Sequence, residues 1–292
     1  MDNTEHIEFF CLDPESKPIP IYPYHKINFS KAIVSKFTSN NQQNEIHYDD
    51  PNIDHKSKIL VKSEPITLKS AGIPALDGFI NDRQRAYISI DLDPEQSACV
   101  KLKNYIKFVD NWADSVNTRE KLFGKMHRKY EFIPSIKEKL TKEKRNLEFV
   151  RFHLNVELSG NQCTNKTKIN RIINNNKKQP IEAPTITDIT NEIRFNSRIN
   201  LVFCCDYIWL IKNSPRSSGP IYGLGFTVYE INYKPKTPIP SLLSFLDSDS
   251  EDEIKSKDES ENEFESEFQS KYGPQDVHEY LKKTMISKKL IY

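Results

Sequence analysis

Two long runs of β-branched and aromatic residues constrain the fold of this chain more than any other feature. Residues 198–212 read RINLVFCCDYIWLIK and residues 222–233 read YGLGFTVYEINY, with a stretch rich in Ser, Pro and Gly at 214–220 between them. This composition predicts a central β-strand, a loop and a return strand. Apolar side chains occupy both the odd and the even positions of the second run, which predicts burial on both faces of the strand. The adjacent Cys204 and Cys205 are then core residues on opposite faces of the first strand.

Upstream of these runs, two further patterns predict one strand and one long helix. Residues 147–158 alternate apolar and polar side chains, as in a half-buried strand. Before them, Asp93 is a suitable helix N-cap, Pro94 suits the first turn and Gln96 completes a capping box. The apolar residues that follow at helical spacing are Ala98, Leu102, Tyr105, Val109, Trp112 and Val116. We expect a helix that packs this stripe against the core.

The composition divides the chain into four segments. Residues 1–55 contain five prolines and the polar tract SNNQQNE, which predicts a flexible, extended arm. Residues 56–240 hold the strand and helix patterns and form the expected core domain. We expect a disordered acidic tail at 241–272 and a short basic helix at 273–292. The predicted fold class is α+β, a strand-dominated antiparallel sheet or OB-like β-barrel with one long helix, a flexible N-terminal arm and an acidic C-terminal tail.

Charge is distributed very unevenly along the chain. Eleven Asp or Glu oppose two Lys in residues 247–268. Because that segment sums to −9 and residues 271–292 sum to +3, the net charge of +1 leaves +7 on residues 1–246. A basic body predicts a polyanionic partner, and a tethered acidic strip predicts an intramolecular competitor for the basic surface. The acidic residues proposed to regulate binding are Asp247, Asp249, Glu251, Asp252 and Glu253.

The sequence carries no motif for catalysis, metal binding or nucleotide hydrolysis. Gly72 and Gly78 lack the spacing of a phosphate-binding loop, and the seven His lack zinc-ligand spacing. Gly223 and Gly225 are interpreted as backbone room at a strand start. No enzyme activity, metal or cofactor is therefore expected. Five scattered Cys without a C-x-x-C pair favour a reducing compartment, and the acidic N-terminus and short apolar runs predict neither export nor a membrane span.

Basic and aromatic residues interleave in residues 119–145, which contain ten Lys or Arg. Single-stranded nucleic acid needs cations along its phosphates and flat rings against its bases, and this pattern supplies both. The alternative is that these rings belong to the core and the charges form a solvated face. For Trp209, a position in the core is favoured over a role as a stacking platform. The candidate nucleic-acid-binding residues, including a second basic set from 166 onward, are Lys121, Phe123, Lys125, Arg128, Lys129, Tyr130, Phe132, Lys166, Lys168, Arg171, Arg194 and Arg198.

A series of segments within residues 75–233 carries a family resemblance. The segments are DLDPEQSACVKLKNYIKFVDNWADS, KLFGK, KYEFIPSIKE, LEFVRFHLNV, PTITDITNEIRFNSRINLVFCCDYIWL and YGLGFTVYEINY. In order and wording they resemble a family from nucleocytoplasmic large DNA viruses, including chlorella-virus and mimivirus relatives. Its members are mostly uncharacterised or described as single-stranded-DNA-binding proteins. The resemblance implies an oligonucleotide-binding β-barrel that coats DNA during replication without enzyme activity.

The sequence therefore predicts a non-enzymatic viral single-stranded-DNA-binding protein whose acidic tail modulates binding. DNA is expected as the ligand in preference to RNA, viral replication or virion proteins are expected partners of the tail, and no membrane is involved. The expected location is the viral factory in the host cytoplasm or the virion. One alternative is a virion structural or packing protein that binds other viral proteins, and another is a transcription accessory factor.

Overall fold

The computed structural model describes residues 8–11, 18–24, 27, 29–38, 41–48, 58–70, 72–76, 81–140, 146–159, 162–173, 177–213, 217 and 219–235. All of these residues belong to one compact unit, Met1–Thr237. The predicted acidic tail at 241–272, with its five regulatory residues, and the predicted helix at 273–292 lie outside the described residues.

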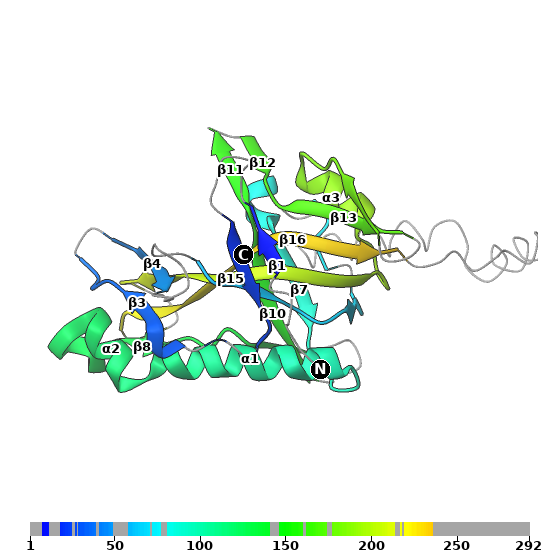
Figure 1. Cartoon of the computed structure of the whole chain (residues 1–292). Coiled ribbons are helices and arrows are strands. Elements are labelled where there is room, and N and C mark those ends of the chain that lie inside the picture. The colour runs from blue at the N-terminus through cyan, green and yellow to red at the C-terminus, as the bar shows by residue number, and fades with distance from the viewer. Residues whose placement is uncertain are drawn as a thin grey trace, which may run out of the picture. The chain divides into compact units, whose positions relative to one another are not determined.

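A ribbon of two long antiparallel strands forms the centre of the sheet (Figure 1). β15 (Arg198–Ile211) and β16 (Ile221–Lys234) pair along their whole length. Register shifts after Val202 and Cys205 mark β-bulges, which increase the local twist. The predicted central strand and return strand are confirmed.

Three short strands border each long edge of this ribbon. The strands on β15, all antiparallel to it, are β4 (Gln43–Tyr48), β5 (Leu60–Lys62) and β6 (Ile66–Thr67). The strands on β16, all parallel to it, are β8 (Glu131–Phe132), β10 (Asn146–Leu154) and β13 (Lys168–Ile172). The sheet is therefore mixed, and the expectation of an antiparallel sheet is wrong. Alternation in a sequence predicts a strand, but the direction of pairing depends on contacts with strands far away in the chain.

The remaining strands extend the sheet outward or form a separate hairpin. Those in the sheet are β1 (Glu8–Phe10), β2 (Ile19–Tyr22), β3 (Ala32–Val34), β7 (Tyr87–Asp91), β9 (Lys137–Leu140) and β14 (Lys178–Ile181). The separate hairpin consists of β11 (Val156–Ser159) and β12 (Gln162–Asn165). The single strand predicted at 147–158 is thus interrupted at Asn155, whose backbone N–H donates to Thr167 Oγ1 at 2.9 Å.

The N-terminal region contributes to the sheet. Four strands, β1 to β4, come from the segment predicted to be a flexible arm at 1–55. Phe29, Ile46 and Tyr48 are each at most 1 % exposed and belong to the main core. For the residues that the structure describes, the expectation of a flexible arm is therefore wrong. The buried alternation within β4 is short, and the polar residues and prolines around it conceal it in the sequence.

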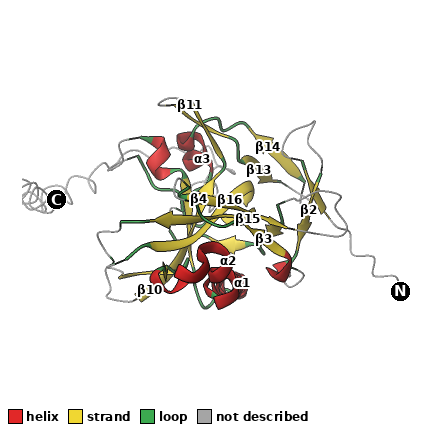
Figure 2. Cartoon of the chain, turned by 90° about the vertical axis from the view of Figure 1, so that its left-hand side faces the viewer, coloured by secondary structure: helices red, strands yellow, loops and turns green. Residues whose placement is uncertain are grey.

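Helices α1 (Ser97–Asp114) and α2 (Val116–Phe123) lie against one face of the sheet (Figure 2). α2 continues into the 3-10 helix η4 (Gly124–Lys129). The other short helices are η2 (Phe29–Lys31), η3 (Asp82–Arg85) and α3 (Ile186–Glu192). Among the described helices, none combines the length and apolar character needed to cross a membrane.

The start of α1 differs from the sequence prediction. Asp93 accepts the Glu95 N–H at 3.0 Å in a turn that precedes the helix, which begins at Ser97. The Gln96 side chain exchanges two hydrogen bonds with the backbone of Thr67 in β6, at 2.9 and 3.1 Å. The predicted capping box does not form, because this side chain attaches the start of α1 to the sheet.

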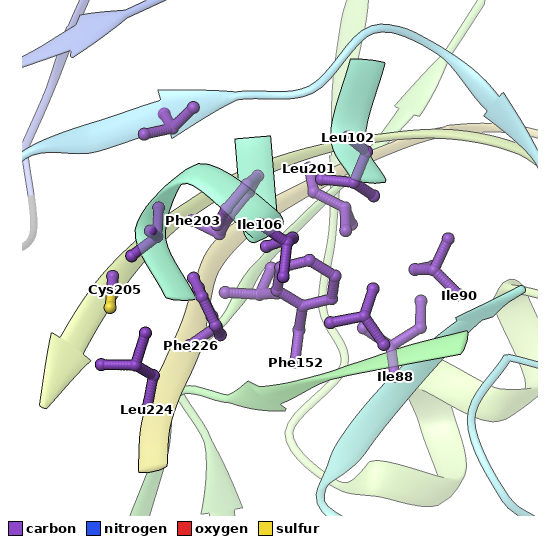
Figure 3. Packing of buried hydrophobic residues seen from close by; sticks show 14 of the residues in the cluster. Ile88, Ile90, Leu102, Ile106, Phe152, Leu201, Phe203, Cys205, Leu224 and Phe226 are labelled. Atoms are coloured by element: carbon purple, nitrogen blue, oxygen red, sulfur yellow. The ribbon is translucent and has the colours of Figure 1, made fainter. Parts of the chain in front are cut away.

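The main core lies between α1 and the central ribbon (Figure 3). Leu102 and Ile106 of α1 point toward Phe203 of β15 and Phe152 of β10, whose rings meet edge to face at 4.8 Å. On the opposite side of the ribbon, which we call the outer face, a smaller cluster comprises Phe10, Ile19, Ile21, Leu60, Val202, Cys204 and Tyr229. Cys205 belongs to the main core and Cys204 to this cluster, so their predicted placement on opposite faces is confirmed.

Candidate nucleic-acid interface

On the outer face, two aromatic rings lie against the backbone of the neighbouring strand. Tyr207 and Trp209 of β15 are half-buried there, and Gly225 and Gly223 of β16 are their direct partners. A Cβ at Gly225 would lie 2.1 Å from Tyr207 Cζ, and one at Gly223 would lie 2.3 Å from Trp209 Cζ2. The indole Nε1 also donates to the backbone oxygen of Leu224 at 3.0 Å. The rings therefore occupy the space that side chains on β16 would otherwise fill.

Further rings and a cation continue from Tyr207 across β10 and β7. The ring centroids of His153 and Tyr207 are 6.4 Å apart, and Tyr87 is the direct partner of His153 in β7. The guanidinium carbon of Arg151 lies 4.6 Å from the ring centroid of Tyr87 and 5.4 Å from that of Phe149. We call the accessible part of this set the outer-face track; its members are Trp209, Tyr207, His153, Tyr87 and Arg151, whereas the ring of Phe149 is buried.

Arg151 is the cation of the track that is available to an anionic ligand. Its side chain is exposed, and no carboxylate among the described residues forms an ion pair with it. The neighbouring Lys139 is 5.4 Å from the centroid of the Phe149 ring but is neutralised by Asp91, at 2.7 Å. A guanidinium held above an aromatic ring keeps its outer N–H groups free to donate to phosphate oxygens.

A groove of about 490 Å³ lies beside Tyr207 and His153. Lys58, Asp206 and Tyr229 line it and contact one another. The Tyr229 hydroxyl donates to Asp206 Oδ2 at 2.7 Å, and Lys58 Nζ donates to the Tyr229 hydroxyl at 2.8 Å and lies 3.5 Å from Asp206 Oδ1. Burial and the adjacent carboxylate raise the pKa of Tyr229, so the phenol stays protonated. The buried carboxylate is thus compensated and does not repel a polyanion strongly.

The His153 imidazole is the titratable ring of the track. Desolvation beside the groove lowers its pKa, and the cations Arg151 and Lys137 lower it further. Near neutral pH it is therefore an uncharged ring next to Tyr207, although its side chain keeps contact with solvent.

The aromatic residues predicted at 119–132 belong to the core instead. Phe123 is 6 % exposed and stacks between Tyr130, at 3.8 Å, and Phe37, at 5.5 Å, with both pairs of rings nearly parallel. Tyr130 and Phe132 are half-buried and pack against the same core. Stacking of a base on Phe123 is therefore ruled out by its burial. The cations around it are exposed on α2 and η4: Lys121, Lys125, Arg128 and Lys129.

The second predicted basic set is scattered over several elements, and four of its five members have partners within the chain. The contacts are Lys166 with Glu157 at 2.8 Å, Lys168 with the backbone oxygen of Cys11 at 2.6 Å, Arg171 with Glu192 at 2.7 Å, and Arg194 with the backbone oxygen of Asn191 at 2.8 Å. The fifth residue, Arg198, is exposed at the start of β15. The structure therefore does not gather the predicted residues into one surface.

Sequence reasoning missed the outer-face track, although its signals are present. Tyr207 and Trp209 are spaced two apart in one strand, as Gly223 and Gly225 are in the next. The match becomes visible only once the register of β15 and β16 is known. The polar side of the strand predicted at 147–158 already contains Arg151 and His153. Within the described ranges, no three His, Cys, Asp or Glu side chains gather closely enough to hold a metal ion.

The described part of the chain is thus strand-dominated, with a curled sheet, helices α1 and α2 on one face and an aromatic and cationic outer face. No family model matches the chain. It is similar to the uncharacterised protein R505 of Acanthamoeba polyphaga mimivirus, with 28% identity over 277 residues, covering 82% of this chain and 68% of the relative. This relative supports the resemblance to uncharacterised giant-virus proteins. Among solved structures, gp2.5, a single-stranded DNA binding protein encoded by bacteriophage T7, gives a TM-score of 0.35 at 11% identity, covering 69% of this chain and 100% of gp2.5. That TM-score is too low to establish a common fold.

Proposed function

We propose that the chain is a non-enzymatic protein that binds single-stranded nucleic acid, DNA in preference to RNA, and coats viral DNA during replication. The curled, strand-dominated sheet supports an OB-like binding module, in which one face of the sheet receives the strand. The positive charge of residues 1–246 supports a polyanionic ligand.

The observation that carries the proposal is the outer-face track. Tyr207 and Trp209 are held in place by the glycines beneath them, so little conformational entropy remains to be lost when a base stacks on them. Stacking of a base on such a ring contributes about 1–3 kcal/mol and depends little on sequence. Arg151 lies on the same face and is free to bind a phosphate.

The same geometry favours single strands over duplexes. In a duplex the faces of the bases are covered by their neighbours, so a ring on the sheet could reach only base edges. The rings of the track stand on β15, β10 and β7, so they are spread across the sheet. A protein that reads the major groove instead inserts one helix or one two-stranded ribbon into it.

The acidic tail completes the proposal. We propose that Asp247, Asp249, Glu251, Asp252 and Glu253 compete with the nucleic acid and recruit replication or virion proteins. The site of action would then be the viral factory in the host cytoplasm or the virion.

The proposal is tested by titrating the full chain with fluorescent oligothymidylate at two salt concentrations. Tyr207→Ala should weaken binding by about 1–3 kcal/mol, or roughly 5- to 150-fold. Phe108→Ala is the matched control, because Phe108 is a 50 % exposed ring on α1, away from the track. A third variant, Lys125→Gln with Lys129→Gln, tests the surface predicted from the sequence and should have a smaller effect than Tyr207→Ala.

Two results would contradict the proposal. Wild-type affinity in a correctly folded Tyr207→Ala variant would remove the track from the site. Binding that ignores salt, or that prefers duplex DNA, would reject the single-strand function and favour a virion packing protein.

A further inference from the structure

A second groove lies at the other end of the central ribbon, on the same outer face. Its volume is about 520 Å³, and it is formed mainly by β5, β13, β14 and the ends of β15 and β16. We call it the ribbon-end groove; its polar lining residues are Lys62, Lys178, Arg198, Asn200, Asn232 and Lys234. Most of these residues stand on paired strands, so the positions of their backbones are fixed by the sheet.

Two cations in this groove have no counter-charge. Arg198 and Lys234 are direct partners across β15 and β16, and like charges directly opposite each other destabilise a sheet. Both are exposed, and within the described residues neither forms an ion pair. The other two cations differ, since Lys62 pairs with Glu8 at 2.6 Å and Lys178 with Glu230 at 2.7 Å. An anion bound between Arg198 and Lys234 would offset their repulsion.

The floor of the groove is polar and mostly ordered by hydrogen bonds. Asn170 Nδ2 donates to Asn232 Oδ1 at 3.1 Å, and Asn232 Nδ2 donates to Glu230 Oε1 at 2.7 Å. Asn200 Nδ2 donates to the backbone oxygen of Ser63, and its Oδ1 is buried without a donor among the described residues. This oxygen has no exposed surface through which a ligand could reach it, so the anion-binding capacity of the groove rests on its two free cations.

The two exposed cations match the chemistry of a phosphate-bearing unit. Its phosphate is an anion that both Arg198 and Lys234 can bind. We propose that the ribbon-end groove is a second binding site, which takes a phosphate-bearing unit of the same strand that occupies the outer-face track. This inference rests on the proposed function, because it assumes that the polyanion is a nucleic acid.

The β1–β2 hairpin separates the two sites. Phe10 and Ile21 pack on the outer face in the cluster that contains Tyr229, a residue of the first groove, and Glu8 pairs with Lys62 of the ribbon-end groove. Along β15, the nine residue-to-residue steps from Arg198 to Tyr207 correspond to about 30 Å at roughly 3.3 Å per step. A strand that engages both sites must therefore pass the hairpin, and a short oligonucleotide can fill only one of them.

The test compares two lengths of oligothymidylate, about 5 and about 15 nucleotides, which lie within the ~4–16 nucleotide range of single-strand sites. The variant is Arg198→Gln with Lys234→Gln in the full chain. The matched control is Lys31→Gln with Lys107→Gln, two exposed cations on η2 and α1. We expect the variant to lose affinity for the long oligonucleotide roughly tenfold at low salt and to show a salt slope shallower by about 0.7, since the groove binds one phosphate and each neutralised phosphate contributes ~0.7. Its affinity for the short oligonucleotide should match that of the wild type. The control variant should match the wild type in its affinity for both oligonucleotides and in its salt slope.

A second measurement separates this inference from the proposed function. Inorganic tripolyphosphate should raise the melting temperature of the wild type, through binding to the folded state, and raise it less in the variant. If no oligonucleotide binds but this difference remains, the proposed function fails and the groove is a phosphate site for another ligand. If the variant matches the wild type with both probes, or loses affinity equally for both oligonucleotide lengths, the ribbon-end groove is not a second site. Circular dichroism checks that the variant is folded. Because the variant removes the repulsion between Arg198 and Lys234, its melting temperature should equal or exceed that of the wild type.

Discussion

At the scale of single residues, the function of a side chain depends on what lies across the strand from it. The sequence pattern favours a core position for Trp209, and from the sequence we interpret Gly225 as backbone room at a strand start. The structure places Trp209 half-buried on the outer face and Gly225 within β16, under the ring of Tyr207. Phe123 shows the reverse, since a ring nominated for stacking is buried between two others. Composition cannot separate these cases, because exposure is decided by register.

Gly225→Ala tests the role of the glycine directly. Its Cβ would lie 2.1 Å from Tyr207 Cζ, so the ring must swing away into the open groove. Because the displaced atoms are the far end of a side chain, and Ala is favoured over Gly in a strand by about 0.5–1 kcal/mol, the free energy of unfolding should change little. Oligonucleotide affinity should nevertheless fall, as it does in Tyr207→Ala. In the Tyr207→Ala background, Gly225→Ala should have no further effect on affinity, and additive losses would contradict this account.

His153 gives the track a pH dependence. Its folded-state pKa is lowered, so the folded protein binds protons less readily than the unfolded chain. Its contribution to stability is therefore complete well above the unfolded pKa of about 6.5 and declines as the pH falls through that value. Protonation of the folded protein also adds a cation to the track, so oligonucleotide affinity should rise as the pH falls through the lowered folded-state pKa. Urea unfolding and titration at pH 8 and pH 5.5 should show both trends in the wild type and weaker ones in His153→Gln. Equal pH dependence in the two proteins would exclude His153 as the source.

At the scale of elements, the sequence predicts which segments are helices and strands better than it predicts how they join. The apolar stripe of α1 was recognised, and its residues from Ala98 to Val109 are buried. Its start was placed too early, because local capping rules identify Asp93 and take no account of Thr67, which is distant in the sequence. For the same reason, alternation located β10 but gave no sign of its parallel pairing with β16.

Gln96→Ala tests whether tertiary contacts fix the start of α1. The variant loses both hydrogen bonds to Thr67 and leaves that backbone less well satisfied, so it should lower the free energy of unfolding by about 1–3 kcal/mol. Asp93→Ala is the comparison, because it removes only the partly exposed turn contacts and should cost less than Gln96→Ala. Urea denaturation of both variants shows which one loses more free energy of unfolding. The opposite order would mean that the predicted cap, and not the contact with the sheet, controls this end of the helix.

At the scale of the whole molecule, the charge pattern indicates the kind of ligand, and the fold is needed to locate the candidate surface. Residues 1–246 are basic, yet many of their cations are paired within the chain, including Lys58, Lys139 and Arg171. Net charge therefore predicted a polyanionic ligand without locating its site. Locating the candidate site needed the strand registers. That of β10 with β7 places Arg151 on the outer face, and that of the central ribbon places Arg198 and Lys234 there, all without carboxylate partners among the described residues.

The acidic residues at 247–267 provide the last prediction, which concerns the whole chain. If the tethered strip competes for the outer face, neutralising its eleven Asp and Glu to Asn and Gln should tighten oligonucleotide binding at low salt. The gain should shrink as salt rises, since screening weakens both the competitor and the ligand contacts. This variant keeps the +3 charge of residues 271–292, which truncation after Pro240 would remove. Adding Arg151→Gln should reduce the gain, because the strip and the oligonucleotide would compete for the same cation. If the neutralised chain binds no more tightly than the wild type at low salt, the strip is not a competitor, and recruitment of partner proteins becomes its better-supported role.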